Sequence, residues 1–122
     1  MNRIRLAVDV LLVEDDDLVR EMLGAALTDA GLDTTESASA EGALEIISAD
    51  VPTVIVTDID LGQGMDGLAL GRAARTRYPD LPIVYISGRY EQVSGLSAAE
   101  RFLPKPFQTS VLLKTIAEIR QA

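Results

Sequence analysis

The chain of 122 residues has the length of one typical domain and is long enough to bury a substantial core. It contains no cysteine and no histidine, which excludes disulfides, thiolate or imidazole metal ligands, and catalytic triads that depend on histidine. Nineteen acidic and eleven basic residues give a net charge of −8. This charge disfavours direct binding to nucleic acid and favours a cation or a basic partner surface.

Nothing in the sequence directs the chain to a membrane or out of the cell. The longest apolar runs, Val10–Val13 and Val54–Val56, are far shorter than the ~20 residues of a membrane-spanning helix. Residues Met1–Leu6 lack the apolar stretch and the cleavage site of a signal peptide. We therefore expect a cytoplasmic protein without membrane contact, in which residues 1–122 form one domain. No effector domain is expected within these residues, and both a stand-alone protein and a part of a longer one remain open.

Short β-branched runs alternate with helix-periodic segments along the whole chain, which predicts a parallel sheet with helices on both faces. The predicted strands are Ala7–Val13, Asp33–Glu36, Val54–Thr57, Ile83–Ile86 and Arg101–Leu103. The first, third and fourth runs are apolar enough to be central strands, since a strand buried on both faces is almost continuously apolar. The second and fifth are expected at the edges.

Five helices are predicted between and after these strands. They lie near Leu18–Ala30, Ala40–Ile47, Leu68–Arg77, Glu91–Ala99 and Thr109–Arg120. The first repeats apolar residues at helical spacing over its whole length, and Gly31 follows as its stop signal. The fourth contains Gly95, which disfavours a helix. The last should turn Leu112, Leu113, Ile116 and Ile119 inward.

Acidic, hydroxyl and basic residues follow four of the predicted strands. Glu14 and Asp15 follow the first strand, Asp58 the third, Ser87 the fourth and Lys105 the fifth. Ligands of open parallel sheets bind beyond the carboxyl ends of the strands, so these side chains should meet at one edge. Clustered carboxylates repel one another unless a cation neutralises them, and an all-oxygen ligand set favours Mg²⁺. With a hydroxyl and a lysine to hold phosphoryl oxygens, the set predicts phosphoryl transfer.

Each of these residues also has a purely structural interpretation. Any of Asp15–Asp17 could cap the first helix, and we expect that at least one does. Asp58 alone could be a turn residue, Ser87-Gly88 is ordinary turn composition, and Lys105 could be a solvated loop residue. Only their joint placement at four strand ends favours a functional site.

The residues at these strand ends resemble those of the receiver domain of bacterial response regulators, and the resemblance covers essentially the whole chain. The stretches that carry it are Leu11–Asp16, Val54–Asp58, Met65–Gly67, Ile83–Ser87 and Leu103–Phe107. The resemblance implies a flavodoxin-like α/β fold of three layers, (βα)5, with a five-stranded parallel sheet of order 2-1-3-4-5.

The resemblance also implies the roles of the site residues. Asp58 would be the phosphoacceptor, and Glu14, Asp15, Asp58 and the main-chain carbonyl of Asp60 would bind Mg²⁺.

Three further positions match the parts of the family that bind the phosphoryl group and respond to it. Ser87 would be the hydroxyl switch, Lys105 the phosphate-binding lysine and Phe102 the aromatic switch. The Lys105-Pro106 peptide would be cis, a conformation available mainly before proline.

The partners implied by the resemblance are proteins. A sensor histidine kinase or a histidine phosphotransfer protein would donate the phosphoryl group, and the domain would catalyse only its own phosphorylation and dephosphorylation. The modified domain would act on a downstream protein target or a fused output domain, without contacting nucleic acid or a membrane, and a phosphorylation-dependent dimer is one form in which it could act. The kinase and the target cannot be identified from these residues because both depend on surface complementarity.

The chain departs from the family pattern in two loops. The spacing from Asp58 to Gly67 is one residue longer than usual, and Gly62–Gly64 replaces a proline-containing turn. The spacing from Ser87 to Lys105 is about four residues shorter than usual, in the region of the poorly supported fourth helix. The conformation of both segments is left open.

Three competing interpretations remain. The run from Gly62 to Gly67 fits the dinucleotide-binding pattern G-x-G-x-x-G, but it follows the third strand instead of the first. Asp58-Ile59-Asp60 resembles the nucleophile motif of haloacid-dehalogenase phosphatases, although that motif usually lies on the first strand. A degenerate receiver that acts only as an interaction module is the third.

One charge pair is expected above the site. Asp60 and Arg89 each lie two residues beyond a site residue on neighbouring strands, so their loops could bring the two charges together. Such a pair would slow water attack on a phosphorylated Asp58 and contribute little to stability, on the order of 0–1 kcal/mol.

Overall fold

The fold is a parallel sheet between two layers of helices, seen in a computed structural model that describes residues 8–88, 93 and 95–120. The strand order is β2-β1-β3-β4-β5, which confirms the flavodoxin-like arrangement with the second and fifth strands at the edges. The strands are β1 (Asp9–Val13), β2 (Asp33–Ser37), β3 (Val54–Asp58), β4 (Ile83–Ser87) and β5 (Glu100–Pro104). The helices within the described residues are α1 (Asp17–Asp29), α2 (Ala40–Ala49), α3 (Gly67–Arg77) and α4 (Thr109–Arg120).

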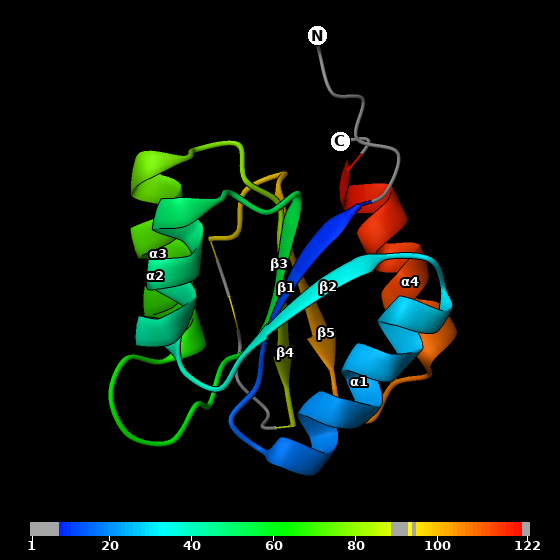
Figure 1. The fold of residues 1–122 in the computed structure, drawn as a ribbon. Helices are drawn as coiled ribbons and strands as arrows, with labels where there is room; N and C mark the ends of the chain where they lie inside the picture. Colours follow the sequence, from blue (N-terminus) through cyan, green and yellow to red (C-terminus); the bar gives the residue numbers. More distant parts are fainter. Residues whose placement is uncertain (1–7, 89–92, 94, 121–122) are drawn as a thin grey trace, which may run out of the picture.

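The helices form two layers because alternate residues of each strand face opposite sides of the sheet. Helices α2 and α3 cover one face, and α1 and α4 cover the other (Figure 1). Leu11, Ile55 and Ile83 belong to the core under α2 and α3, whereas Leu12 and Val56 belong to the core under α1 and α4. The central strands are buried on both faces, which explains why their sequences are nearly continuous apolar runs.

Helix α1 exposes part of the apolar face that its sequence predicts. Leu18 and Met22 are 66% and 64% exposed, whereas Gly24 and Leu27 are buried against the sheet. The apolar face that the sequence predicts for α1 is therefore wider than the part of the helix that the sheet and α4 cover. In α4 the predicted inward residues do face the core, with Leu112, Ile116 and Ile119 buried and Leu113 packed beside them.

The predicted helix over Glu91–Ala99 is wrong for the part of it that the structure describes, residues 93 and 95–99. Gly95 has a φ of +76°, a conformation outside the right-handed helical region. The Ser97 hydroxyl accepts a hydrogen bond from the Ala99 amide, and the Ser97 amide donates to the Glu100 carboxylate. These local side-chain hydrogen bonds replace the backbone bonds of a helix.

Helix α3 packs closely on β4 because Gly71 has no side chain. The buried Tyr85 side chain of β4 lies against Gly71, and its hydroxyl donates a hydrogen bond of 2.7 Å to Glu100 Oε2. A Cβ atom on residue 71 would overlap the Tyr85 hydroxyl oxygen. The Tyr85 ring is rigid and buried, so a side chain at position 71 would displace α3 from β4.

We therefore expect Gly71→Ala to lower the free energy of unfolding by about 1–3 kcal/mol, the usual cost of overpacking a core. The loss should occur although alanine is the better helix former by about 1 kcal/mol. Urea denaturation followed by circular dichroism measures it. Adding Tyr85→Phe removes the overlapping oxygen, so the double variant should lose less than the sum of the two single variants. A neutral or stabilising Gly71→Ala would contradict the close packing.

Within the described ranges, none of the helices combines the length and the apolar character that crossing a membrane would require.

Candidate functional site

The candidate site is a cleft of about 460 Å³ at the carboxyl ends of the strands. The cleft is lined by Glu14, Asp15, Asp16, Val19, Asp58, Asp60, Gly62, Ser87, Gly88 and Lys105. The parallel sheet brings these residues together, because β1, β3, β4 and β5 all end at this edge. The predicted meeting of residues from four strand ends is therefore observed.

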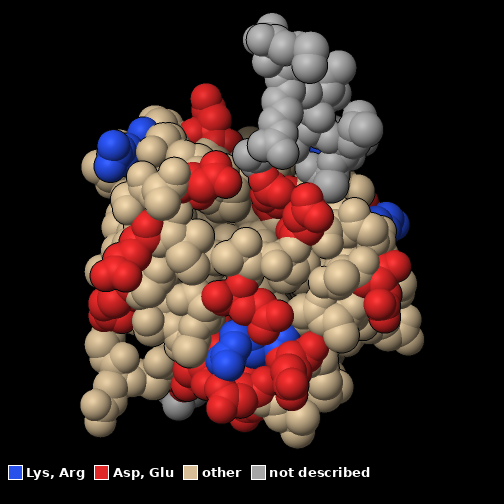
Figure 2. All heavy atoms as spheres, in the orientation of Figure 1, with Lys and Arg blue, Asp and Glu red and all other residues tan. Residues whose placement is uncertain are grey.

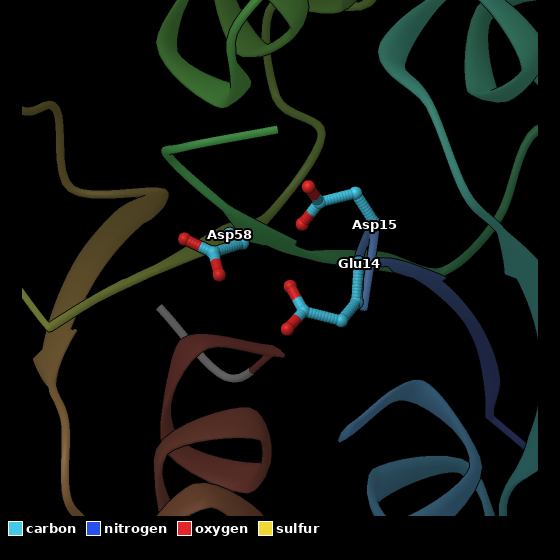
Figure 3. A group of neighbouring side chains, drawn as sticks. All are labelled: Glu14, Asp15 and Asp58. Atoms are coloured by element: carbon cyan, nitrogen blue, oxygen red, sulfur yellow. The ribbon is translucent and has the colours of Figure 1, made fainter. Parts of the chain in front are cut away.

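Three carboxylates converge in this cleft (Figure 3). Glu14 and Asp15 follow β1, and Asp58 is the last residue of β3. Each offers a carboxylate oxygen, and these three atoms lie within 4.8 Å of one another. Glu14 is 3% exposed, whereas Asp15 is exposed and Asp58 is intermediate. The most buried of the three thus lies deepest, and the other two face the opening.

Lys105 places a positive charge between two of these carboxylates. Its Nζ lies 2.8 Å from Asp58 Oδ2 and 3.7 Å from Glu14 Oε1. Burial by itself lowers the pKa of Lys105, but the hydrogen bond to Asp58 and the charges of Asp58 and Glu14 outweigh it and raise the pKa. Lys105 is therefore charged at neutral pH. Its main-chain amide donates to the Ser87 carbonyl, and the Lys105-Pro106 peptide is cis, as expected.

One lysine does not neutralise three carboxylates, and the raised pKa of Glu14 reflects the remaining negative charge as well as burial. Burial is the main reason that the pKa of the Glu14 carboxyl rises from 4.5 to about 8, and the hydrogen bond and negative charge of the adjacent Asp58 raise it further. Glu14 Oε2 is buried and accepts no hydrogen bond from any residue that the structure describes. A buried oxygen without a donor beside two further carboxylates fits a hard divalent cation such as Mg²⁺.

The loop after β3 is folded back onto Asp58. The Asp60 amide donates a hydrogen bond of 3.1 Å to Asp58 Oδ1, and the Gly62 amide donates 3.2 Å to Asp60 Oδ1. Asp60 lines the cleft, and its main-chain carbonyl as a metal ligand stays a prediction. The expected pair of Asp60 with Arg89 also stays a prediction, because Arg89 lies outside the described residues.

Backbone conformation and close contacts explain the glycines between β3 and the start of α3. Gly62 and Gly64 have φ values of 75° and 88°, a region that favours glycine. The Glu41 carboxylate of α2 accepts a hydrogen bond of 2.9 Å from the Met65 amide, and it would lie 2.8 Å from a Cβ on residue 64. A Cβ on Gly67 would overlap the main-chain carbonyl oxygen of Asp58. The G-x-G-x-x-G spacing is thus explained by the loop without a nucleotide.

The two predicted switch residues lie in different surroundings. Ser87 is 2% exposed at the end of β4 and lines the cleft. Phe102 lies on β5 beside Tyr85 of β4, is partly buried against the core under α2 and α3, and is not among the residues that line the cleft. The structure therefore places Ser87 in the site and Phe102 beside the adjacent core.

The aspartates after β1 have separate roles. Asp15 belongs to the carboxylate cluster, whereas Asp16 is the N-cap of α1 and accepts a hydrogen bond of 3.0 Å from the Val19 amide. The expectation that at least one of them is a cap is confirmed. Asp17 binds Arg20, a residue that the sequence analysis did not single out. The pair of Asp17 with Arg20 is an i,i+3 contact within α1, whereas the contacts of Arg20 with the Glu14 carbonyl and with Glu36 reach other elements and leave no local pattern.

The model of the family described as response regulator receiver domain matches residues 10–117. The chain belongs to this family. The receiver is 36% identical over 100 residues to the DNA-binding transcriptional regulator NtrC of Klebsiella pneumoniae, which covers 79% of this chain and 21% of that protein. It is 37% identical over 112 residues to the response regulator MprA of Mycolicibacterium vanbaalenii, covering 88% of this chain and 48% of that one.

Solved structures agree with this assignment. The crystal structure of a response regulator receiver protein from Sinorhizobium medicae has a TM-score of 0.85 and 31% sequence identity, and the match covers 96% of this chain and 97% of that one. The chain is therefore a phosphoacceptor receiver domain of two-component signalling, and the three competing interpretations are not favoured. Receiver domains generally bind Mg²⁺ at an acidic pocket, and this receiver has the corresponding acidic cluster.

Proposed function

We propose that Asp58 accepts a phosphoryl group from a phosphohistidine and that the rest of the cleft serves this transfer. The observation that carries the proposal is the position of Asp58. Its carboxylate lies at the opening of the cleft, hydrogen-bonded by Lys105 Nζ at 2.8 Å and by the Asp60 amide at 3.1 Å. A carboxylate held by two donors is fixed in orientation, which in-line attack requires.

In the transfer, a carboxylate oxygen of Asp58 attacks the phosphorus atom and forms the new O–P bond. The P–N bond to the donor histidine breaks, and the imidazole keeps the bonding electron pair and takes up a proton. Lys105 remains charged and stabilises negative charge on the phosphoryl oxygens. When bound by Glu14, Asp15, Asp58 and the Asp60 carbonyl, Mg²⁺ supplies further positive charge to those oxygens.

The response to phosphorylation would begin at Ser87 and pass to Phe102. Ser87 lines the cleft and donates to a phosphoryl oxygen in this proposal, which draws it toward Asp58. Phe102 lies on the neighbouring strand, beside Tyr85, and changes orientation as β4 adjusts. The domain catalyses only its own phosphorylation and dephosphorylation, and its output is a change in protein contacts.

The partners follow from the same chemistry. In the cytoplasm, a sensor histidine kinase or a histidine phosphotransfer protein would donate the phosphoryl group to this domain, and a downstream protein or a fused output domain would receive the signal. The chain spans 21% of NtrC and 48% of MprA, so an output domain in the same polypeptide accords with both relatives. A phosphorylation-dependent dimer is part of the proposal, whereas direct contact of residues 1–122 with nucleic acid is not, given the net charge of −8.

The proposal is tested with acetyl phosphate, a small phosphoryl donor, and intact-mass spectrometry. In the presence of Mg²⁺ the protein should gain one phosphoryl group per chain, and a chelator added beforehand should prevent the gain. Turnover of p-nitrophenyl phosphate without stoichiometric labelling would instead favour a phosphatase. Absence of labelling, with beryllofluoride also failing to bind, would favour a degenerate receiver.

Lys105→Met should slow the initial rate of labelling by about 100-fold, the usual loss when one electrostatic donor to a transition state is removed. The exposed Lys114 of α4 offers a matched control, because its side chain is 78% exposed and pairs only with Glu118 among the ion pairs described. Lys114→Met should label at the wild-type rate. Equal rates in the two variants would contradict the role of Lys105.

A further inference from the structure

Arg20 of α1 joins three parts of the molecule next to the candidate metal site. Its Nη1 donates a hydrogen bond of 2.9 Å to the main-chain carbonyl of Glu14, and its Nη2 lies 2.7 Å from Asp17 Oδ1. Its Nε lies 3.6 Å from Glu36 Oε1 on β2. The side chain is only 19% exposed, so the guanidinium is held between α1, β2 and the turn that follows β1. Figure 2 shows basic atoms enclosed by acidic side chains low on this face.

The carbonyl that Arg20 binds belongs to the peptide that joins Glu14 to Asp15. The same turn is held from its other side, because the Glu14 amide donates 3.1 Å to the Ser37 carbonyl at the end of β2. The guanidinium therefore holds the Glu14-Asp15 peptide plane between the two proposed metal ligands, and the backbone bond holds the Val13-Glu14 peptide that precedes it. Rotation of this plane would redirect the side chain of Asp15, which is exposed and has little packing to hold it.

Gly24 provides an independent observation on the same contact. Glycine inside a helix costs roughly 1 kcal/mol relative to alanine, so its presence in α1 requires a reason. A Cβ atom on Gly24 would lie 2.6 Å from Glu36 Oε2. Glycine at this position thus leaves room for the Glu36 carboxylate to lie over α1 and reach Arg20.

We propose that Arg20 is a positioning residue for the metal site: it holds the Glu14-Asp15 peptide in the orientation in which both carboxylates bind Mg²⁺. The inference rests on the proposed function of the cleft and extends it to a residue outside the cleft. Glu36 holds the guanidinium in turn, and Gly24 leaves space for Glu36. Partners of metal ligands commonly change metal affinity by 10–100-fold when they are removed.

The direction in which Mg²⁺ affinity changes when Arg20 is replaced distinguishes a positioning role from a purely electrostatic one. Removing a positive charge beside a cation site should by itself tighten Mg²⁺ binding, because a repulsion is lost. Loss of positioning should weaken it. We expect Arg20→Met to bind Mg²⁺ about tenfold more weakly in isothermal titration calorimetry of the folded protein. Lys114→Met is the matched control, because it removes the same charge from an exposed side chain of α4, and it should stay within about twofold of wild type.

A second variant covers the case in which Arg20→Met does not fold. Gly24→Ala keeps every charge and favours the helix, but it displaces the Glu36 carboxylate from Arg20. We expect it to weaken Mg²⁺ binding about threefold, less than Arg20→Met because the bond to the Glu14 carbonyl remains. Affinity within about twofold of wild type, or tighter, in Arg20→Met would overturn the inference. If Arg20→Met is unfolded, an unchanged Mg²⁺ affinity in Gly24→Ala would overturn the inference instead.

The wild-type protein separates this inference from the proposed function. If wild type neither binds Mg²⁺ nor accepts a phosphoryl group, the proposed function fails. If wild type does both and the Arg20 and Gly24 variants bind Mg²⁺ as it does, only the role of Arg20 fails.

Discussion

Asp58→Ala should take up no phosphoryl group from acetyl phosphate under conditions in which the wild-type protein is fully labelled. The carboxylate is the nucleophile of the proposed reaction, so its removal should abolish labelling instead of slowing it. Lys105 would remain in the cleft without a carboxylate at 2.8 Å and has no nucleophilic role that could replace Asp58. Intact-mass spectrometry over a time course measures the result.

Asp60→Asn is the control for this experiment, because Asp60 is a second carboxylate at the opening of the same cleft. Its proposed role uses the main-chain carbonyl, and asparagine retains both this carbonyl and a side-chain oxygen that can accept from the Gly62 amide. Asp60→Asn should therefore still accept one phosphoryl group. Labelling of Asp58→Ala, or loss of labelling only in Asp60→Asn, would show that the nucleophile is assigned to the wrong aspartate.

The second large effect concerns Glu14 and pH. Because the folded state raises the pKa of Glu14 from 4.5 to about 8, ionising this carboxyl opposes folding. Without metal, the stability that depends on Glu14 should be complete below about pH 4.5 and should fall as pH rises toward 8. At about 1.4 kcal/mol per pKa unit, the loss has an upper bound of about 5 kcal/mol. Urea denaturation in chelator across this pH range measures it.

Glu14→Gln should remove most of this pH dependence and make the metal-free protein more stable at pH 8, because the amide carries no charge. The same variant should lose the stabilisation by Mg²⁺, which for wild type amounts to about 2.7 kcal/mol at a concentration of 100 times Kd. Asp15→Asn is the matched control. It should also weaken stabilisation by Mg²⁺, but the metal-free pH dependence should remain, because the charge of Asp15 is the smallest cause of the Glu14 shift.

Two results would contradict this account of Glu14. A metal-free stability that does not change between pH 4.5 and 8 would show that the carboxyl is ionised without cost. A large loss of metal-free stability in Asp15→Asn would show that Asp15 is chiefly structural, although Asp16 is the residue that caps α1.

The sequence predicts the sheet and most of the site for the same reason. Strands β1, β3 and β4 are buried on both faces, so their apolar runs are long and end abruptly at polar residues. The residues at those ends, Glu14, Asp58 and Ser87, are also the residues of the cleft. In a parallel sheet the boundary of a strand therefore marks the position of the chemistry.

The features that the sequence did not predict depend on contacts between distant segments. The contact of Arg20 with Glu36 joins a helix to an edge strand, and the contact of Glu41 with Met65 joins a helix to a loop. Neither leaves a periodic or local pattern. The exposure of Leu18 likewise depends on how much of α1 its neighbours cover, which the periodicity of one helix does not determine.

The site is assembled from four strands, and this bears on when the protein becomes competent to react. Lys105 and Asp58 are separated by 47 positions, and the lysine follows β5, the edge strand that pairs with β4. Contacts between residues so far apart in the sequence form more slowly than local ones, so we expect the pairing of β5 to form late in folding. A partly folded chain would hold Asp58 without its lysine. Under the proposed function, such a chain would take up a phosphoryl group about as slowly as Lys105→Met, so the last strand to join the sheet would set when the protein reacts at its full rate.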